Sequence, residues 1–197
     1  MQIKDRTKHM FAQALVEMLA DVPLEKVRVT KLCARCGAAM PTFYYHFRDK
    51  YELVVWIFLQ DILAVDADCR ADGGRISLDR ILRQVEQKKT FYQRAFTDQS
   101  QNSLGEYIHG FIVRYYKAAV RDAAGEEPTP EQLFAIRYHT CGVIGMFREW
   151  LFGQDADAGD LTRLLFERMP DFMQRASAVC PLSAADIHRL LDSSGGS

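Results

Sequence analysis

The chain has 197 residues, 48% of them hydrophobic, and a net charge of −1, which excludes disordered, collagen-like and low-complexity classes. This charge is uneven: residues 1–50 hold nine Lys and Arg against five Asp and Glu, and the remainder holds sixteen against twenty-one. A basic N-terminal part (+4) on an acidic body (−5) is typical of a nucleic-acid-binding unit, because a phosphate backbone attracts local positive charge.

No apolar run approaches the roughly 20 residues that span a bilayer, and no apolar signal core begins the chain. Five scattered cysteines form an odd set, which predicts free thiols in a reducing compartment. We therefore expect a cytoplasmic protein without a membrane partner.

Apolar residues at three- and four-residue spacing predict helices throughout the chain. The first amphipathic helix covers about residues 3–19 and ends at Val22-Pro23. A short second helix is expected to open with Thr30 as its N-cap and to close at Gly37, which can take the left-handed conformation of a helix end.

A third short helix is expected within residues 38–47, where Pro41 is tolerated in the first turn. Phe43 and Phe47 are the apolar residues that would hold it against the first two helices. Three short helices, with a tight glycine turn between the second and third, predict a helix-turn-helix whose third helix enters the major groove of DNA.

The segment Asp49-Lys50-Tyr51-Glu52 has the form of a capping box and predicts the start of a long helix that runs to about Cys69. Strand signals are absent, so the predicted fold class is all-α. Further helices are expected at about 77–97, 104–123, 130–153 and 159–178. The expected domains are a DNA-binding domain at 1–55, a C-terminal helical dimerisation and effector domain at 56–192, and a flexible tail at 193–197.

The predicted helix at 130–153 is apolar on nearly every side, and Gly142 and Gly145 permit close backbone approach. One face can cover the core of the monomer and another a second copy of the chain. The helix at 159–178 adds an apolar stripe, with a kink expected at Pro170. Together the two helices predict a four-helix homodimer interface, and the alternative is a purely internal core.

Two helix starts flank the third helix of the predicted DNA-binding unit. Thr30 and Lys50 lie at these starts, where backbone N–H groups and polar side chains can bind phosphates. Ala39 and Met40 cannot make a bidentate contact with guanine, so base readout there is expected to be apolar, as to a thymine methyl. The predicted DNA-binding residues are Thr30, Ala39, Met40, Thr42, Tyr44, Tyr45, His46 and Lys50.

A specific string of residues covers this region. It reads Val29-Thr30-x-Leu32-Cys33-x-x-Cys36-Gly37 and, after four more residues, Thr42-Phe43-Tyr44-Tyr45-His46-Phe47-x-Asp49-Lys50-x-x-Leu53. The string resembles the DNA-binding signature of the TetR/AcrR family of regulators. This resemblance implies an all-helical homodimeric repressor, with DNA contacts, mostly to phosphates, by Thr30, Thr42, Tyr44, Tyr45, His46 and Lys50.

A looser pattern extends the resemblance toward the subfamily named after regulators of dihydroxyacetone kinase. It consists of Trp56-Ile57-Phe58, Phe91-Tyr92, Gln101-Asn102-Ser103 and the series Tyr138, Gly142, Gly145, Trp150-Leu151 and Gly153. The family resemblance implies a small-molecule effector, with a protein partner as the alternative means of control. Two heads related by a two-fold axis predict a near-palindromic operator.

Aromatic residues in the body could line an effector pocket or form ordinary core. The predicted ligand-binding residues are Phe91, Tyr107, Phe111, Tyr115, Tyr138 and Phe147. The sequence does not distinguish the two interpretations.

Signals for metal binding and catalysis are weak. Cys33-x-x-Cys36 lacks a partner pair, and the five histidines show no metal-binding spacing, so we expect no metal and no cofactor. No phosphate loop, nucleophile elbow or paired catalytic carboxylates can be identified. We therefore expect a regulator rather than an enzyme, with an enzyme that lacks a known motif as the rival.

Overall fold

The computed structural model describes residues 3–71, 77–97, 103–153, 157–185 and 187. In these residues the chain forms ten α-helices, one short 3-10 helix and no strand, which confirms the predicted all-α fold. The expected tail at 193–197 lies outside the described residues. The elements are α1 (Ile3–Asp21), η1 (Leu24–Lys26), α2 (Val29–Cys36), α3 (Met40–His46), α4 (Lys50–Ala71), α5 (Leu78–Gln87), α6 (Lys89–Phe96), α7 (Leu104–Ala124), α8 (Pro130–Phe152), α9 (Ala158–Glu167) and α10 (Asp171–Val179).

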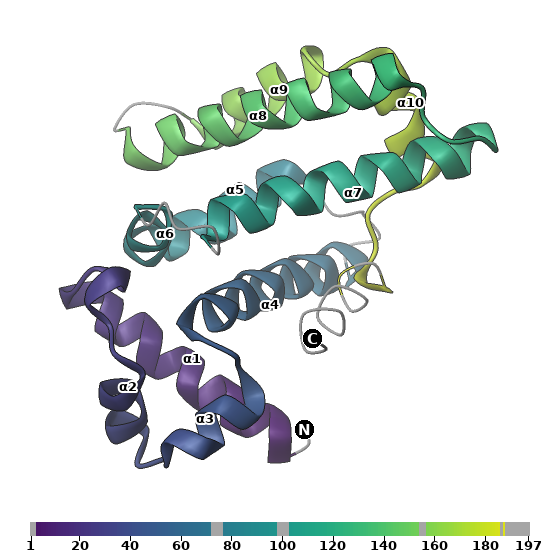
Figure 1. Ribbon diagram of the computed structural model, residues 1–197. Coiled ribbons are helices and arrows are strands. Elements are labelled where there is room, and N and C mark those ends of the chain that lie inside the picture. The colour runs from purple at the N-terminus through teal and green to yellow at the C-terminus, as the bar shows by residue number, and fades with distance from the viewer. Residues whose placement is uncertain (1–2, 72–76, 98–102, 154–156, 186, 188–197) are drawn as a thin grey trace.

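The first three α-helices form a head at one end of the molecule, with α3 beside α1 (Figure 1). Phe43 of α3 is 0% exposed, and its ring meets that of Phe11 on α1 edge to face, with 5.3 Å between the centroids. Phe47 is buried beside it. The prediction that these two phenylalanines hold the third helix is confirmed.

Helix α2 begins two residues earlier than predicted. Its N-cap is Arg28, with extended backbone and no side-chain cap hydrogen bond, so the expectation that Thr30 caps this helix is wrong. The N–H groups of Lys31 and Leu32 both donate to the Arg28 carbonyl, which places Thr30 in the first turn. Burial of Val27 and Leu32 fixes this register, since tertiary packing outweighs the preference of threonine for a cap. Gly37 ends α2 at φ 61°, as predicted.

Helix α4 connects the head to the body (Figure 1). Asp49 caps it by accepting the N–H groups of Tyr51 and Glu52, at 2.9 and 2.8 Å. Glu52 accepts the N–H of Arg48 instead of that of Asp49, so the Asp49 half of the predicted capping box forms and the return hydrogen bond goes to the preceding residue. Residues 53–59 of α4 are all buried, because the head covers this helix on one side and the body on another.

Two helices expected to be continuous are each divided. The predicted helix 77–97 breaks at Lys88, between α5 and α6, where the side chain of Lys88 reaches Asp61 on α4. The predicted kink at Pro170 is a complete break, and Pro170 becomes the N-cap of α10. Proline has no N–H to continue the ladder of α9, so the chain turns there and α10 returns to α7.

Helices α7, α8 and α10 enclose a second, smaller core. Met173 and Ala176 of α10 are buried against Ala119 and Val120 of α7 and Ile136 of α8. The part of the predicted apolar stripe that lies in α10 therefore faces the interior of the monomer.

Candidate nucleic-acid interface

Helix α3 divides its aromatic residues between the core and the surface. Phe43 and Phe47 face inward, whereas Tyr44 and Tyr45 are exposed, Tyr45 by 67%. The ring of His46 lies edge to face against Tyr45, with 5.0 Å between the centroids. An exposed helix that carries two phenol groups and an imidazole can donate and accept hydrogen bonds along its outer side.

The other predicted residues of this region lie close to α3 in the chain and on its surface. Ala39 and Met40 are exposed at the start of α3, and Thr42 is half-buried in its first turns. Thr30 is exposed in the first turn of α2, which contacts α3. The structure thus gathers these predicted residues on one short helical unit.

Exposed cations accompany this surface, although we did not predict them individually. Arg28 and Lys31 lie at the start of α2, and Arg48 lies between α3 and α4. The +4 surplus of residues 1–50 was the signal for such a patch. Charge counts do not tell which cations remain exposed, because folding decides which of them pair with carboxylates.

Lys50 has three acceptors within the head. Its Nζ donates to the carbonyls of Leu24, Glu25 and Val27, at 2.8, 3.1 and 3.1 Å. These carbonyls belong to η1 and the residues that follow it, directly before α2. Lys50 therefore holds the start of α4 beside the start of α2, which brings two helix N-termini, each with a partial positive charge, to the same side of the head.

Glu17 on α1 fixes the position of α2. The guanidinium of Arg35 donates to Glu17 Oε2 through both Nε and Nη2, at 3.2 and 2.8 Å. This hydrogen bonding by Arg35 lowers the pKa of the Glu17 carboxyl. A two-point contact of this kind restricts rotation of α2 against α1.

The cysteine pair of α2 has ordinary packing contacts. Cys33 is buried, and the thiol of Cys36 donates to the Met10 carbonyl at 3.7 Å. Burial raises the pKa of both thiols, which disfavours the thiolate that binds metals. Across the described residues, no group of three or more His, Cys, Asp or Glu could hold a metal ion, and no described helix is long and apolar enough to cross a membrane.

A helical head with an exposed third helix, joined by one long helix to an all-helical body, defines a helix-turn-helix DNA-binding regulator. Residues 12–56 match the family described as bacterial regulatory proteins, tetR family, and residues 76–166 match a transcriptional regulator C-terminal region of the same group. The chain belongs to the TetR family of transcriptional regulators.

Individual relatives agree with this assignment. The chain is similar to the HTH-type dhaKLM operon transcriptional activator DhaS of Lactococcus lactis subsp. lactis (strain IL1403), with 22% identity over 152 residues that cover 73% of this chain and 78% of the relative. The structure of a dihydroxyacetone kinase operon activator DhaS has a TM-score of 0.51 and 18% identity, covering 83% of this chain and 96% of that one. A TetR regulator from Rhodococcus sp. RHA1 has a TM-score of 0.51 and 22% identity, covering 91% and 99%.

The six residues predicted to bind an effector lie on α6, α7 and α8 and differ in their burial. Phe91 and Phe111 are buried in α6 and α7, and Phe147 packs on Phe96 with 5.0 Å between the ring centroids. Tyr107 is half-buried on α7, and the hydroxyl of Tyr115 donates to the Cys180 carbonyl at 2.9 Å. Tyr138 is 75% exposed on α8.

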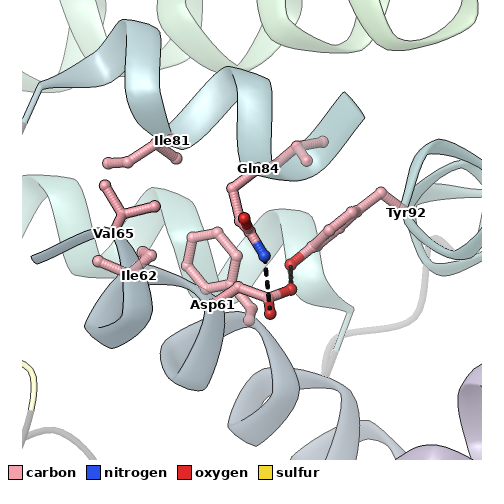
Figure 2. A pocket seen from close by; sticks show the side chains of 8 residues that line it. Asp61, Ile62, Val65, Ile81, Gln84 and Tyr92 are labelled. Carbon is pink, nitrogen blue, oxygen red and sulfur yellow. Dashed lines mark hydrogen bonds between the residues drawn. The ribbon is translucent and has the colours of Figure 1, made fainter. Parts of the chain in front are cut away.

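A narrow cavity lies elsewhere, between α4, α5 and α6 (Figure 2). It contains none of the six predicted residues, although it borders Tyr92, the neighbour of Phe91. The buried carboxylate of Asp61 lies at this cavity. An Asp within an otherwise apolar stretch of α4 was the sequence signal that could have indicated it.

The outer side of α8 carries a continuous exposed apolar surface. Phe134 and Tyr138 stack there, with 6.2 Å between centroids and 15° between planes, and Met146 and Phe152 extend the surface along the helix. A side chain added at Gly142 or Gly145 would meet nothing within 4 Å in the single chain.

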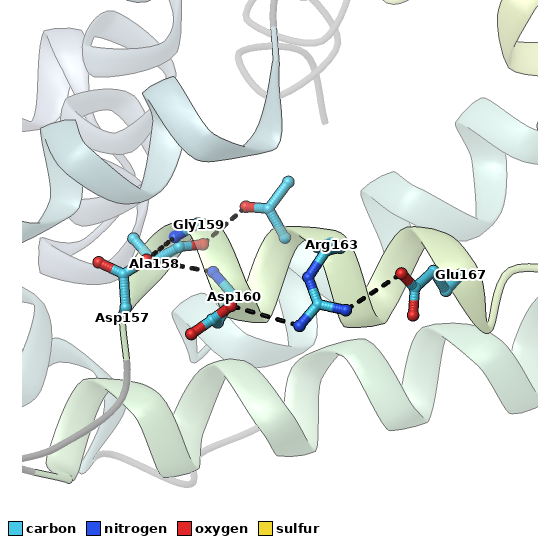
Figure 3. A network of polar contacts seen from close by, with 7 residues as sticks. Asp157, Ala158, Gly159, Asp160, Arg163 and Glu167 are labelled. Atoms are coloured by element: carbon cyan, nitrogen blue, oxygen red, sulfur yellow. Dashed lines mark hydrogen bonds and ion pairs between the residues drawn. The ribbon is translucent and has the colours of Figure 1, made fainter.

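Helix α9 also has two exposed apolar side chains, Leu164 and Phe166. Its polar side is ordered by Asp157, which caps the helix through the N–H groups of Gly159 and Asp160, and by Arg163, which bridges Asp160 and Glu167 (Figure 3). We call the exposed apolar residues of α8 and α9 the α8–α9 face. Exposed apolar side chains that gather on neighbouring helices are typical of an interaction surface.

Proposed function

We propose that this chain binds a near-palindromic operator as a homodimer and acts by binding alone, without catalysis. The observation that carries the proposal is the division of α3, which buries Phe43 and Phe47 and exposes Tyr44 and Tyr45. A purely structural helix would turn its aromatic rings inward, since exposed aromatic surface is unfavourable in water. Insertion into the major groove would remove these exposed rings from water and bring their hydroxyl groups to the base edges.

Within this proposal the residues around α3 divide into two groups. Thr42 and Tyr45, with the apolar Ala39 and Met40, contact base edges. Thr30, Tyr44, His46 and Lys50 contact or position the phosphate backbone, together with the exposed cations Arg28, Lys31 and Arg48. Lys50 contributes in two ways. Its positive charge attracts the phosphate backbone, and its ammonium fixes the two helix starts that face the phosphates.

The homodimer is proposed to form through the α8–α9 face. A two-fold axis beside α8 would place Phe134 and Tyr138 against the same residues of the second copy, as an isologous interface requires. Gly142 and Gly145 would then let the two α8 backbones approach closely. Because α10 packs on α7, the proposed interface includes the first half of the predicted stripe at 159–178 and leaves out the second.

Control by a small effector is part of the proposal, because α4 begins at the DNA-binding head and ends in the body. A ligand that binds one position of α4 better than another would change the spacing of the two heads. We expect repression. The relative from Lactococcus lactis is named an activator. In this proposal, the position of the operator relative to its promoter decides whether binding represses or activates transcription.

Selection of operators from random duplexes, followed by titration at several salt concentrations, tests DNA binding. We expect one near-palindrome with half-sites about one helical turn apart or a multiple of it, and an affinity that falls steeply with salt. Thr30→Ala, His46→Ala and Lys50→Ala should weaken all duplexes similarly, and Lys50→Ala should flatten the salt dependence by about one unit of slope.

The matched control is Lys117→Ala, which removes an exposed cation from α7 in the body. This variant should leave both the affinity for DNA and its salt dependence unchanged. Selection that enriches no sequence, together with binding that does not depend on salt, would refute the proposal. A helical regulator that acts through a protein partner would then be the better description.

A further inference from the structure

The five cysteines, all of which lie within the described residues, differ in their access to solvent. Cys33 and Cys69 are buried, Cys36 and Cys180 are half-buried, and Cys141 alone is exposed. A thiol reacts with a dissolved compound only where that compound can reach the sulfur. Cys141 is therefore the thiol that is open to chemistry.

Cys141 also has the partner that a nucleophilic thiol requires. Its Sγ on α8 lies 3.6 Å from Nε2 of His109 on α7. When this nitrogen carries no proton, the thiol donates to it, and the imidazole can take the proton as the sulfur attacks a carbon atom. The packing of α7 on α8 thus brings together a nucleophile and a base that are 32 residues apart in the chain.

Cys36 shows the contrast within the same molecule. Its thiol donates to the Met10 carbonyl at 3.7 Å. A carbonyl oxygen accepts a hydrogen bond but is too weak a base to take the proton, and burial raises the pKa of this thiol. We therefore expect Cys36 to react more slowly than Cys141.

The surroundings of Cys141 favour an apolar reagent. Cys141 follows Tyr138 by three residues and Phe134 by seven, so the thiol lies on the same side of α8 as these two stacked rings. Gly145, one turn later, leaves open space beside the sulfur. A flat apolar molecule can lie on the exposed ring of Tyr138 with a reactive carbon close to Sγ.

A metal ion is the other kind of group that a cysteine and a histidine can bind. A stable site usually needs three or four protein ligands, and the described residues supply no group of three at any place. Two ligands alone make a weak metal site, whereas one nucleophile and one base are sufficient for covalent chemistry.

We propose that Cys141 and His109 form a modification site for apolar α,β-unsaturated carbonyl compounds. The sulfur forms a bond with the β-carbon, the carbon–carbon double bond breaks, and its electron pair moves onto the carbonyl group as an enolate. His109 takes the thiol proton, and the imidazolium returns it to the α-carbon. The reaction is an addition, so it needs no oxidant, reductant or leaving group.

The adduct has a consequence for the dimer, and this step rests on the proposed function. Cys141 lies beside Phe134 and Tyr138 of the α8–α9 face, which is the proposed interface. A group bonded to Sγ would occupy the space that the second copy needs, so modification and dimerisation exclude each other. Because two heads bind the operator together, trapping of single chains by the adduct lowers operator occupancy.

The first test ranks the thiols of the full-length wild type. N-phenylmaleimide carries an activated double bond and an apolar ring, and N-phenylsuccinimide is the saturated control that cannot add a thiol. After treatment with one equivalent at neutral pH, peptide mass spectrometry should find label on Cys141 at least about tenfold faster than on any other cysteine. Faster labelling of Cys36 or Cys180, or equal labelling of all three, would overturn the inference.

Two variants assign the rate to the pair. His109→Gln keeps a polar side chain but removes the base, and it should slow the labelling of Cys141 by about tenfold or more. His139→Gln is the matched control, because residues two apart on a helix do not face each other, and it should label like the wild type. An unchanged rate in a folded His109→Gln protein would overturn the inference. If circular dichroism shows that this variant does not fold, the ranking of the wild-type thiols decides.

The last test follows the dimer and the operator. Labelled wild type should dimerise and bind its operator at least about tenfold more weakly than unlabelled protein, and Cys141→Ser should behave alike before and after treatment. A labelled protein that remains a dimer on its operator would overturn the proposed consequence and leave the proposed function intact. A chain that selects no operator before treatment loses the proposed function, while the labelling rates still decide whether Cys141 and His109 act as a pair.

Discussion

Two exposed aromatic surfaces of this molecule have similar residue types and opposite surroundings. On α3, Tyr44 and Tyr45 are accompanied by half-buried polar groups and by exposed cations at neighbouring helix starts. On α8, Phe134 and Tyr138 stack on each other beside two glycines and further apolar residues. The comparison teaches that an exposed aromatic ring does not identify its partner. Nearby charge indicates nucleic acid, whereas nearby small apolar residues indicate another protein surface.

The largest effect is expected where α3 is held to the head. Phe43→Ala removes a ring that is fully buried against α1 and should lower the free energy of unfolding by about 3–5 kcal/mol. Urea denaturation measures it. Tyr44→Ala, the exposed neighbour on the same helix, should change stability by less than about 0.5 kcal/mol. Similar losses in the two variants would contradict the division of α3 into a buried and an exposed side.

The next effect concerns α8. Replacing both Phe134 and Tyr138 by Asp should weaken the dimer roughly 100-fold, about 2.7 kcal/mol, because carboxylates would be buried against each other. Sedimentation and circular dichroism measure association and helix content, and the latter should not change, since both side chains are exposed in the single chain.

Gly142→Gln sharpens this prediction. The single chain has open space at Gly142, so the Gln side chain should not disturb the monomer. If this variant fails to dimerise, the two α8 backbones approach each other closely at Gly142. Ala67→Gln, at an exposed position of α4, is the matched control. A dimer that withstands both the double Asp variant and Gly142→Gln would place the interface elsewhere.

A smaller effect distinguishes base contacts from phosphate contacts on α3. Thr42→Ala and Tyr45→Ala should weaken binding to the selected operator by roughly 1–3 kcal/mol and leave binding to random duplexes nearly unchanged. Competition titrations with both kinds of duplex measure the difference. An equal loss on both duplexes would assign these side chains to the phosphate backbone.

The smallest effect depends on pH. Arg35 lowers the pKa of Glu17 in the folded head, so the stabilisation by this pair is present above the ordinary pKa of Glu and is lost as the pH falls through the lower folded value. Glu17→Gln should therefore melt slightly below the wild type at neutral pH, and the difference should vanish as the pH falls through the lowered pKa of Glu17. A difference that persists in acid would mean that the loss is not electrostatic.

Much of the fold was predictable from local patterns. Helical periodicity gave most helices, Gly37 marked the turn before α3, and Phe43 and Phe47 were identified as the anchors of that helix. These features depend on residues close together in the chain, where spacing and turn chemistry decide the structure.

The sequence predicted the structure less well where it depends on contacts between residues that are distant in the chain. The break at Lys88 depends on Asp61, which is 27 residues earlier in the chain. The exposure of Tyr138 likewise depends on the packing of α8, which the sequence does not give, and its predicted place in an effector site stays a prediction. A pattern within one helix tells that a residue is apolar, but it does not tell which neighbour will cover it.

The buried core is continuous from the head into the body. One cluster extends from Phe11 on α1, through residues 53–59 of α4, to Leu151 on α8. A boundary at residue 55 would cut through it. We therefore expect a chimaera in which this head is grafted onto a foreign body to need the inner side of α4 as well. We therefore expect substitutions that change operator choice and those that change the effector response to depend on each other, because both act on one continuous core.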